Sequence, residues 1–117
     1  QAYQWGNTLF VTGGYVYDTT NDKFTTCNDL TAIDLPELID WVKSPGSQMQ
    51  SNTILQAAGR LGDGTDYEGG LFQVTGGGMY EINGKRHIVF GQKFEGPYDP
   101  NQSCQKYTSQ VRCFEID

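Results

Sequence analysis

The chain has 117 residues, the size of one domain, and 8 Lys and Arg against 14 Asp and Glu give it a net charge of −6. This acidic balance argues against binding to nucleic acid or to an anionic membrane through the long-range field. Apolar runs span only a few residues, as in Leu9-Phe10-Val11, so no segment is expected to insert into a bilayer.

The N-terminal segment predicts a β-hairpin followed by a polar loop. Ala2–Trp5 and Thr8–Thr12 flank Gly6-Asn7, a two-residue turn of the hairpin type. Gly13-Gly14 then ends the second arm. Asp18–Lys23 is too polar to be buried, so we expect it in a loop at the rim of the fold.

The next stretch contains a short strand and an ambiguous segment. Leu30–Asp34 alternates as a strand does, and Pro36 ends it. The residues from Pro36 to Lys43 have proline first, acids early and lysine late, which favours one or two helical turns. A bend leading to a strand at Trp41 is the alternative. Ile54–Ala58 predicts a weak strand.

The strongest local signal lies between residues 76 and 91. Asn83-Gly84 separates the apolar arms Met79–Ile82 and Arg86–Phe90, and a type I′ turn requires positive φ at both central positions. Gly59–Gly70, which precedes this region, is expected to be an exposed connector. After the hairpin we expect a long loop over Gln92–Gln105.

The last strand is expected over residues 107–117, with Val111 and Cys113 on one face and Phe114 and Ile116 on the other. No long helical period is present, so the sequence predicts an all-β protein.

The two halves of the chain share one order of segments. Leu9–Gly14 matches Ile88–Gln92, and Leu30–Asp34 matches Val111–Glu115. The offset from Gly14 to Gly91 is 77 residues. This is longer than the roughly 50 residues of a kelch repeat, so an insertion between Trp41 and Gly70 is required. An unrelated β-sandwich with two glycine-rich hairpins is the alternative explanation.

These residues resemble kelch-repeat β-propellers, in which a strand ends in Gly-Gly, a variable loop follows and a Trp precedes the fourth strand. The first copy has Gly13, Gly14 and Trp41, whereas the second has Gly91-Gln92 and no Trp before the sequence stops. Residues 74–78, 89–94 and 107–112 look like secreted kelch proteins of Bacteroidetes-type bacteria. Structural roles are therefore expected for a small set of residues: Gly13, Gly14, Trp41, Asn83, Gly84 and Gly91.

The resemblance implies a partial propeller. Propellers have roughly 4 to 8 blades, and at roughly 50 residues a blade this chain supplies about two. We expect approximate blade copies at 1–58 and 59–117 within a single propeller segment. The remaining blades then belong to a longer chain or to other copies, and the apolar faces of the terminal blades should be exposed.

The cysteines do not have the spacing of a metal site. Cys104 and Cys113 are the candidate disulfide pair, which leaves Cys27 over, and three free thiols are the alternative. Residue 1 is Gln rather than Met, which indicates that the start has been processed or cut. If a signal peptide was removed, the compartment is oxidising, so we expect an extracellular, cell-surface or periplasmic location.

No catalytic set can be defended from the sequence. His87 is the only histidine and is expected on a strand face. Asp63-Gly64-Thr65-Asp66 with Glu68 has oxygen ligands without the spacing of a calcium loop, and Asn101-Gln102-Ser103 fits a glycosylation acceptor. Gly76-Gly77-Gly78 leads into a strand, so a nucleotide role is not expected. The sequence accordingly predicts no catalytic, cofactor-binding or metal-binding residues.

The sequence therefore predicts a non-catalytic, secreted or cell-surface segment that binds protein or glycan through rim loops. Aromatic residues in two of these loops are the candidate contacts: Tyr15, Tyr17, Phe24, Phe94 and Tyr98. Two alternatives remain open. One is part of a propeller enzyme, similar to galactose oxidase or another carbohydrate-active enzyme, with its catalytic residues outside this segment. The other is a structural subunit of an extracellular assembly.

Overall fold

The computed structural model describes residues 1–59, 70–96 and 105–116. Most elements in these ranges are strands, so the prediction of an all-β fold is confirmed, with one short helix added. In chain order the elements are β1 (Ala2–Trp5), β2 (Thr8–Thr12), β3 (Tyr15–Asp18), β4 (Lys23–Thr26), β5 (Leu30–Asp34), α1 (Leu35–Val42), β6 (Ile54–Ala57), β7 (Gly78–Ile82), β8 (Lys85–Val89), β9 (Gln92–Phe94), β10 (Gln105–Tyr107) and β11 (Val111–Phe114).

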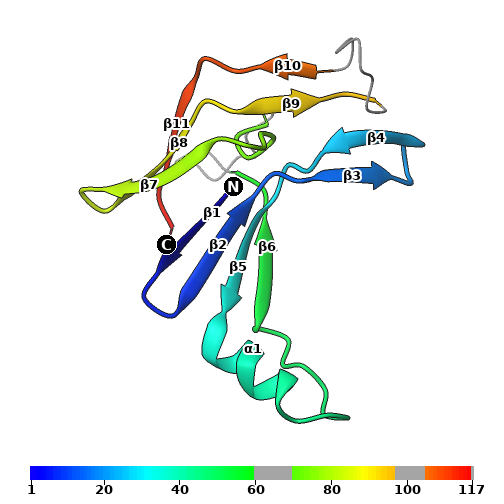
Figure 1. Ribbon diagram of the computed structural model, residues 1–117, viewed down its shortest axis with the longest axis vertical. Coiled ribbons are helices and arrows are strands. Elements are labelled where there is room, and N and C mark those ends of the chain that lie inside the picture. Colours follow the sequence, from blue (N-terminus) through cyan, green and yellow to red (C-terminus); the bar gives the residue numbers. More distant parts are fainter. Residues whose placement is uncertain (60–69, 97–104, 117) are drawn as a thin grey trace.

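The first half of the chain forms a four-stranded antiparallel sheet in the order β1-β2-β5-β6, with strands adjacent in the order in which they occur. The β3–β4 hairpin is inserted between β2 and β5 and extends beyond the sheet (Figure 1). A kink at Gly13-Gly14 joins β2 to β3. Gly13 has a φ of 75°, and a Cβ there would lie 1.9 Å from the carbonyl oxygen of Val74, so only glycine fits.

The second half repeats this plan in a three-stranded sheet, β11-β8-β7, with the β9–β10 pair extending from it (Figure 1). Strands β2 and β3 start at residues 8 and 15, and β8 and β9 start at residues 85 and 92. Both offsets equal the 77 residues between Gly14 and Gly91. The second strand of each sheet and the strand that follows it therefore recur at one spacing in the two halves.

The two predicted hairpin turns are confirmed, and they differ in type. Asn83 and Gly84 have φ values of 52° and 79°, as a type I′ turn requires. At the other hairpin Gly6 has a φ of 59° while Asn7 stays at negative φ, which is the pattern of a type II′ turn. Each hairpin holds its strands in the register that puts one apolar set on the inner face.

The core lies between the two sheets. Phe10 from the first sheet packs with side chains of the second sheet and with Phe72 and Val74 from the segment before β7; the second-sheet residues are Met79, Ile88 and Phe114. The rings of Phe72 and Phe114 meet edge to face with centroids 5.0 Å apart. The buried guanidinium of Arg86 lies 4.3 Å from the ring centroid of Trp5, so a cation–π contact joins β8 to β1.

Burial decreases towards the outer edge of the first sheet. Tyr3, Phe10, Ala32 and Leu55 form one cross-strand row on the face that carries the core. Phe10 is buried, Tyr3 and Ala32 are partly buried, and Leu55 on β6 is 55% exposed. The contact between the sheets is thus made by the strands nearer β1, and β6 projects away from it.

The ambiguous segment after β5 is a helix, not a bend. The Asp34 side chain caps α1 by accepting a hydrogen bond of 3.0 Å from the Glu37 backbone amide, and Pro36 lies in the first turn. Trp41 lies on this helix, which precedes β6, the fourth strand of the first sheet. Its Nε1 donates a hydrogen bond of 2.9 Å to the Ser47 carbonyl oxygen. Within the described ranges no helix is long and apolar enough to cross a membrane.

Two expected loops are wrong in detail. The polar stretch after Gly14 is a hairpin, in which only residues 19–22 form the turn, and the stretch after Gly91 begins with β9. The expected last strand is two strands, β10 and β11, separated at residues 108–110. Phe90, expected as the end of a strand arm, instead lies in the kink with a φ of 58°.

Candidate functional site

The candidate site is at the tip of the β3–β4 hairpin, where β9 from the other half of the chain runs beside β4. Four of the aromatic residues that the sequence singled out meet here, although they come from segments about 80 residues apart. We call Tyr15, Tyr17, Phe24 and Phe94 the tip cluster.

The hairpin register explains the tip cluster. Tyr17 lies directly opposite Phe24, and Tyr15 lies two residues earlier on the same face. Phe24 meets the Tyr15 ring at a centroid distance of 5.3 Å and the Tyr17 ring at 5.0 Å. Phe94 completes the group at 5.5 Å from Tyr15. Tyr15, Tyr17 and Phe24 are partly exposed and Phe94 is half-buried, so the cluster forms an aromatic surface rather than a core.

Hydrogen bonds fix β9 against β4. The buried hydroxyl of Thr26 accepts from the Phe94 backbone amide at 2.8 Å, and the Gly96 amide donates to the Phe24 carbonyl at 2.7 Å. The Tyr15 hydroxyl donates to the Gly96 carbonyl at 2.8 Å. These bonds hold the aromatic rings in place, since they join the two strands that carry them.

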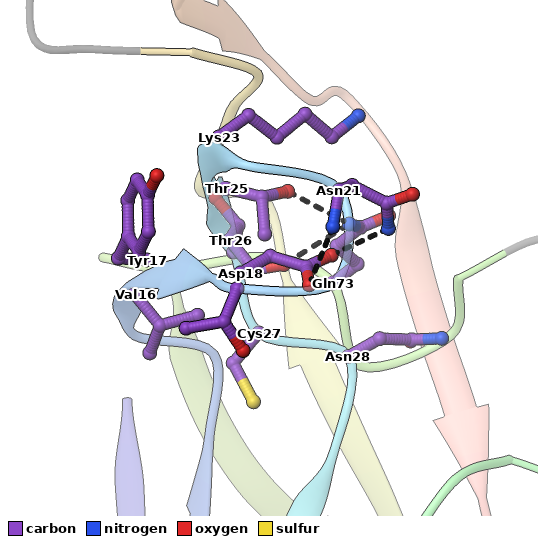
Figure 2. A pocket seen from close by; sticks show the side chains of 11 residues that line it. Val16, Tyr17, Asp18, Asn21, Lys23, Thr25, Thr26, Cys27, Asn28 and Gln73 are labelled. Atoms are coloured by element: carbon purple, nitrogen blue, oxygen red, sulfur yellow. Dashed lines mark hydrogen bonds between the residues drawn. The ribbon is translucent and has the colours of Figure 1, made fainter.

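A cavity of about 480 Å³ lies beside the hairpin, and Tyr17 is the member of the tip cluster that lines it. Figure 2 shows side chains of the hairpin and of Gln73 around it. Most of its polar lining residues are neutral, and its charged residues, Asp18 and Lys23, have opposite signs. The neutral polar residues include Asn21, Thr25, Asn28 and Gln73. Gln73 donates from Nε2 to the Thr26 carbonyl at 3.0 Å, which ties the segment before β7 to the hairpin.

The hairpin turn is organised by one carboxylate. Asp18 accepts hydrogen bonds from the Asn21 side-chain amide at 2.7 Å and from the backbone amides of Thr20 and Asn21 at 3.0 and 3.3 Å. The Asn21 side chain is the main reason that the pKa of Asp18 lies below its ordinary value. Asp18 is therefore ionised at neutral pH, and it leaves the amide of Asn21 oriented along the rim of the cavity.

Cys27 also lines the cavity, and its chemistry is not that of a nucleophile. Burial raises the pKa of the Cys27 thiol above its ordinary value, and the thiol donates to the Asp29 carboxylate at 3.5 Å. A reactive thiol needs a lowered pKa. Burial therefore leaves Cys27 in its protonated, weakly nucleophilic form at neutral pH.

Several residues named from the sequence lie elsewhere. Cys113 is a free thiol on β11 opposite His87, and Cys27 is also free, while Cys104 lies outside the described residues, so the expected pairing is not described. His87 faces away from the core on β8. Tyr98, the acidic stretch 63–68 and Asn101 also lie outside the described residues. Within the described part of the chain no cluster of residues could hold a metal ion.

Sequence reasoning missed Thr26 and Gln73, which connect the hairpin to the rest of the fold. A Thr within a strand and a Gln before Val74 carry no local signal, because their partners are 47 or more residues away in the sequence. Comparison of the chain with family models, with curated proteins and with solved structures finds no match.

Proposed function

We propose that the chain forms two adjacent blades of a kelch-type β-propeller in a secreted or cell-surface protein, and that its hairpin tip binds a glycan without catalysing a reaction. The antiparallel sheet β1-β2-β5-β6 has the strand number of a propeller blade, and β7-β8-β11 repeats its first three strands. A long excursion follows the second strand of each sheet, where the kelch resemblance implies a variable loop.

Exposed apolar side chains support further blades beside these two. Tyr80, Ile82 and Val111 lie on the outer face of the second sheet and are 58%, 56% and 57% exposed. Apolar side chains gathered on one sheet face favour burial against a neighbouring layer. A further blade, from a longer chain or from another copy, would cover this face as the first sheet covers the inner one.

The observation that carries the glycan proposal is the tip cluster beside a polar cavity. A pyranose ring has apolar C–H faces that pack on aromatic rings, and its hydroxyl groups need donors and acceptors at the edge. The tip offers both, since Tyr17 borders the cavity that Asn21 and Asn28 line. The volume lies within the range of about 300 to 1,000 Å³ for small-molecule sites.

The proposal is tested by titrating the chain with a panel of purified oligosaccharides and following backbone amide signals by NMR. We expect shifts at Tyr17, Asn21 and Asn28, and an affinity at least about fivefold lower for Tyr17→Ala, equal to about 1 kcal/mol. Tyr80→Ala is the matched control, because Tyr80 is an exposed tyrosine of another sheet. Equal loss in both variants, or shifts confined to other residues, would reject the tip as the glycan site.

A further inference from the structure

The kink in the second half of the chain contains a second aromatic cavity that the glycan proposal does not use. It has a volume of about 460 Å³ and is lined by Phe90 and Tyr107, with Gly76 and Gly91 between. Phe90 is 53% exposed and Tyr107 is 72% exposed, so neither ring contributes much to the core. We call this site the kink cavity.

Phe90 is held in a conformation that phenylalanine disfavours. Its φ of 58° is left-handed, and a bulky residue with positive φ is an outlier that the surrounding structure must enforce. The repeat shows which residue suits the position, since Gly13 lies 77 residues earlier with a φ of 75°. The second half thus has a strained aromatic residue where the first half has glycine.

Backbone hydrogen bonds maintain the strain. The Phe90 amide donates to the Gln110 carbonyl at 3.0 Å, and the Thr108 amide donates to the Gly91 carbonyl at 2.9 Å. These bonds connect the two sides of the kink. Because an exposed ring gains little from packing, strain of this kind indicates a binding role for the ring.

The polar groups of the kink cavity define the ligand. The described lining residues include no charged side chain, although the chain as a whole is acidic, so the cavity matches a neutral ligand. Gln92 already accepts a hydrogen bond from Gln105 at its side-chain oxygen. The Thr108 hydroxyl is buried without a partner, and the hydroxyl groups of Tyr107 and Ser109 add two more donors.

We propose that the kink cavity binds a neutral proline-rich segment in the polyproline II conformation. Such a segment presents apolar rings and carbonyl acceptors, and its prolines have no N–H that requires an acceptor. Aromatic-lined grooves recognise this conformation.

The test uses the whole chain and a capped hexaproline peptide, with affinity measured by calorimetry. We expect binding, and at least about a tenfold loss in Phe90→Gly and in Tyr107→Ala, as removal of an aromatic anchor produces. Phe90→Gly should also melt at the same temperature as the parent chain or higher, because glycine relieves the strain. Tyr17→Ala, at the tip cluster, should bind hexaproline unchanged, which separates this site from the glycan site.

Absence of hexaproline binding to the parent chain would overturn the assignment. So would a melting temperature lowered by Phe90→Gly, since the ring would then be structural, or equal affinity of the parent and both kink variants. Cellohexaose is the comparison ligand. If it binds through Phe90 and Tyr107 and hexaproline does not, the kink cavity is a sugar site instead.

Discussion

Among single residues, those at the kinks after β2 and after β8 have backbone conformations that few side chains allow. Gly13, Gly14 and Gly91 all have positive φ and lie where a strand changes direction. An added Cβ would meet nothing within 4 Å at Gly14, but it would lie 2.8 Å from the Thr75 carbonyl oxygen at Gly91 and 1.9 Å from the Val74 carbonyl oxygen at Gly13. Replacement of Gly13, where the approach is closest, should therefore be penalised twice, by conformation and by a steric clash.

Gly13→Ala should lower the free energy of unfolding by about 3 kcal/mol or more, because the methyl group meets the Val74 carbonyl. Gly6→Ala is the matched control. Gly6 also has positive φ, but a Cβ there meets nothing within 4 Å, so only the conformational cost of about 1 kcal/mol is expected. Urea unfolding monitored by circular dichroism measures both. Equal losses in the two variants would show that the close contact has no energetic consequence.

The Asp18 turn provides a pH-dependent prediction. Its folded pKa is lowered, so the contribution of the turn is present above the ordinary value of 3.8 and is lost as the pH falls through the folded value. We expect a carboxyl titration midpoint below 3.8 by NMR. Asn21→Ala removes the largest cause and should raise the midpoint. A midpoint unchanged by Asn21→Ala would contradict the assigned hydrogen bond.

At the scale of elements, the sequence predicts most of the strands because their signals are local. Asn83-Gly84 and Gly6-Asn7 specify the hairpins, and Leu30–Asp34 has an alternating pattern. The β3–β4 pair was expected as a loop, because its polar turn hides two short strands. The contact of β4 with β9 has no local signal in the sequence, since it joins distant segments of the chain.

Thr26 is the residue that tests this contact. Thr26→Val keeps the shape but leaves the Phe94 amide without its acceptor, and should lower the free energy of unfolding by about 1 to 3 kcal/mol. Thr26→Ser retains the hydroxyl and serves as the control. We also expect Thr26→Val to change the near-ultraviolet circular dichroism of the tip cluster, since Phe94 is held there by this bond. An unfolding energy higher for Thr26→Val than for Thr26→Ser would contradict the role of the hydroxyl.

At the scale of the whole molecule, the two sheets share an inner core and leave apolar side chains on their outer faces. On the second sheet, Ile88 is fully buried on one face while Tyr80 and Val111 are largely exposed on the other. Closure of a ring by further blades remains our proposal, and it makes the outer faces contact surfaces.

Light scattering across a concentration series tests this proposal most directly. We predict that the 117-residue chain self-associates, with a mass that rises with concentration, and that Tyr80→Lys combined with Val111→Lys reduces the association. Circular dichroism confirms that the double variant stays folded. A stable, compact monomer at every concentration would contradict the account of these sheets as neighbouring blades of a larger radial assembly.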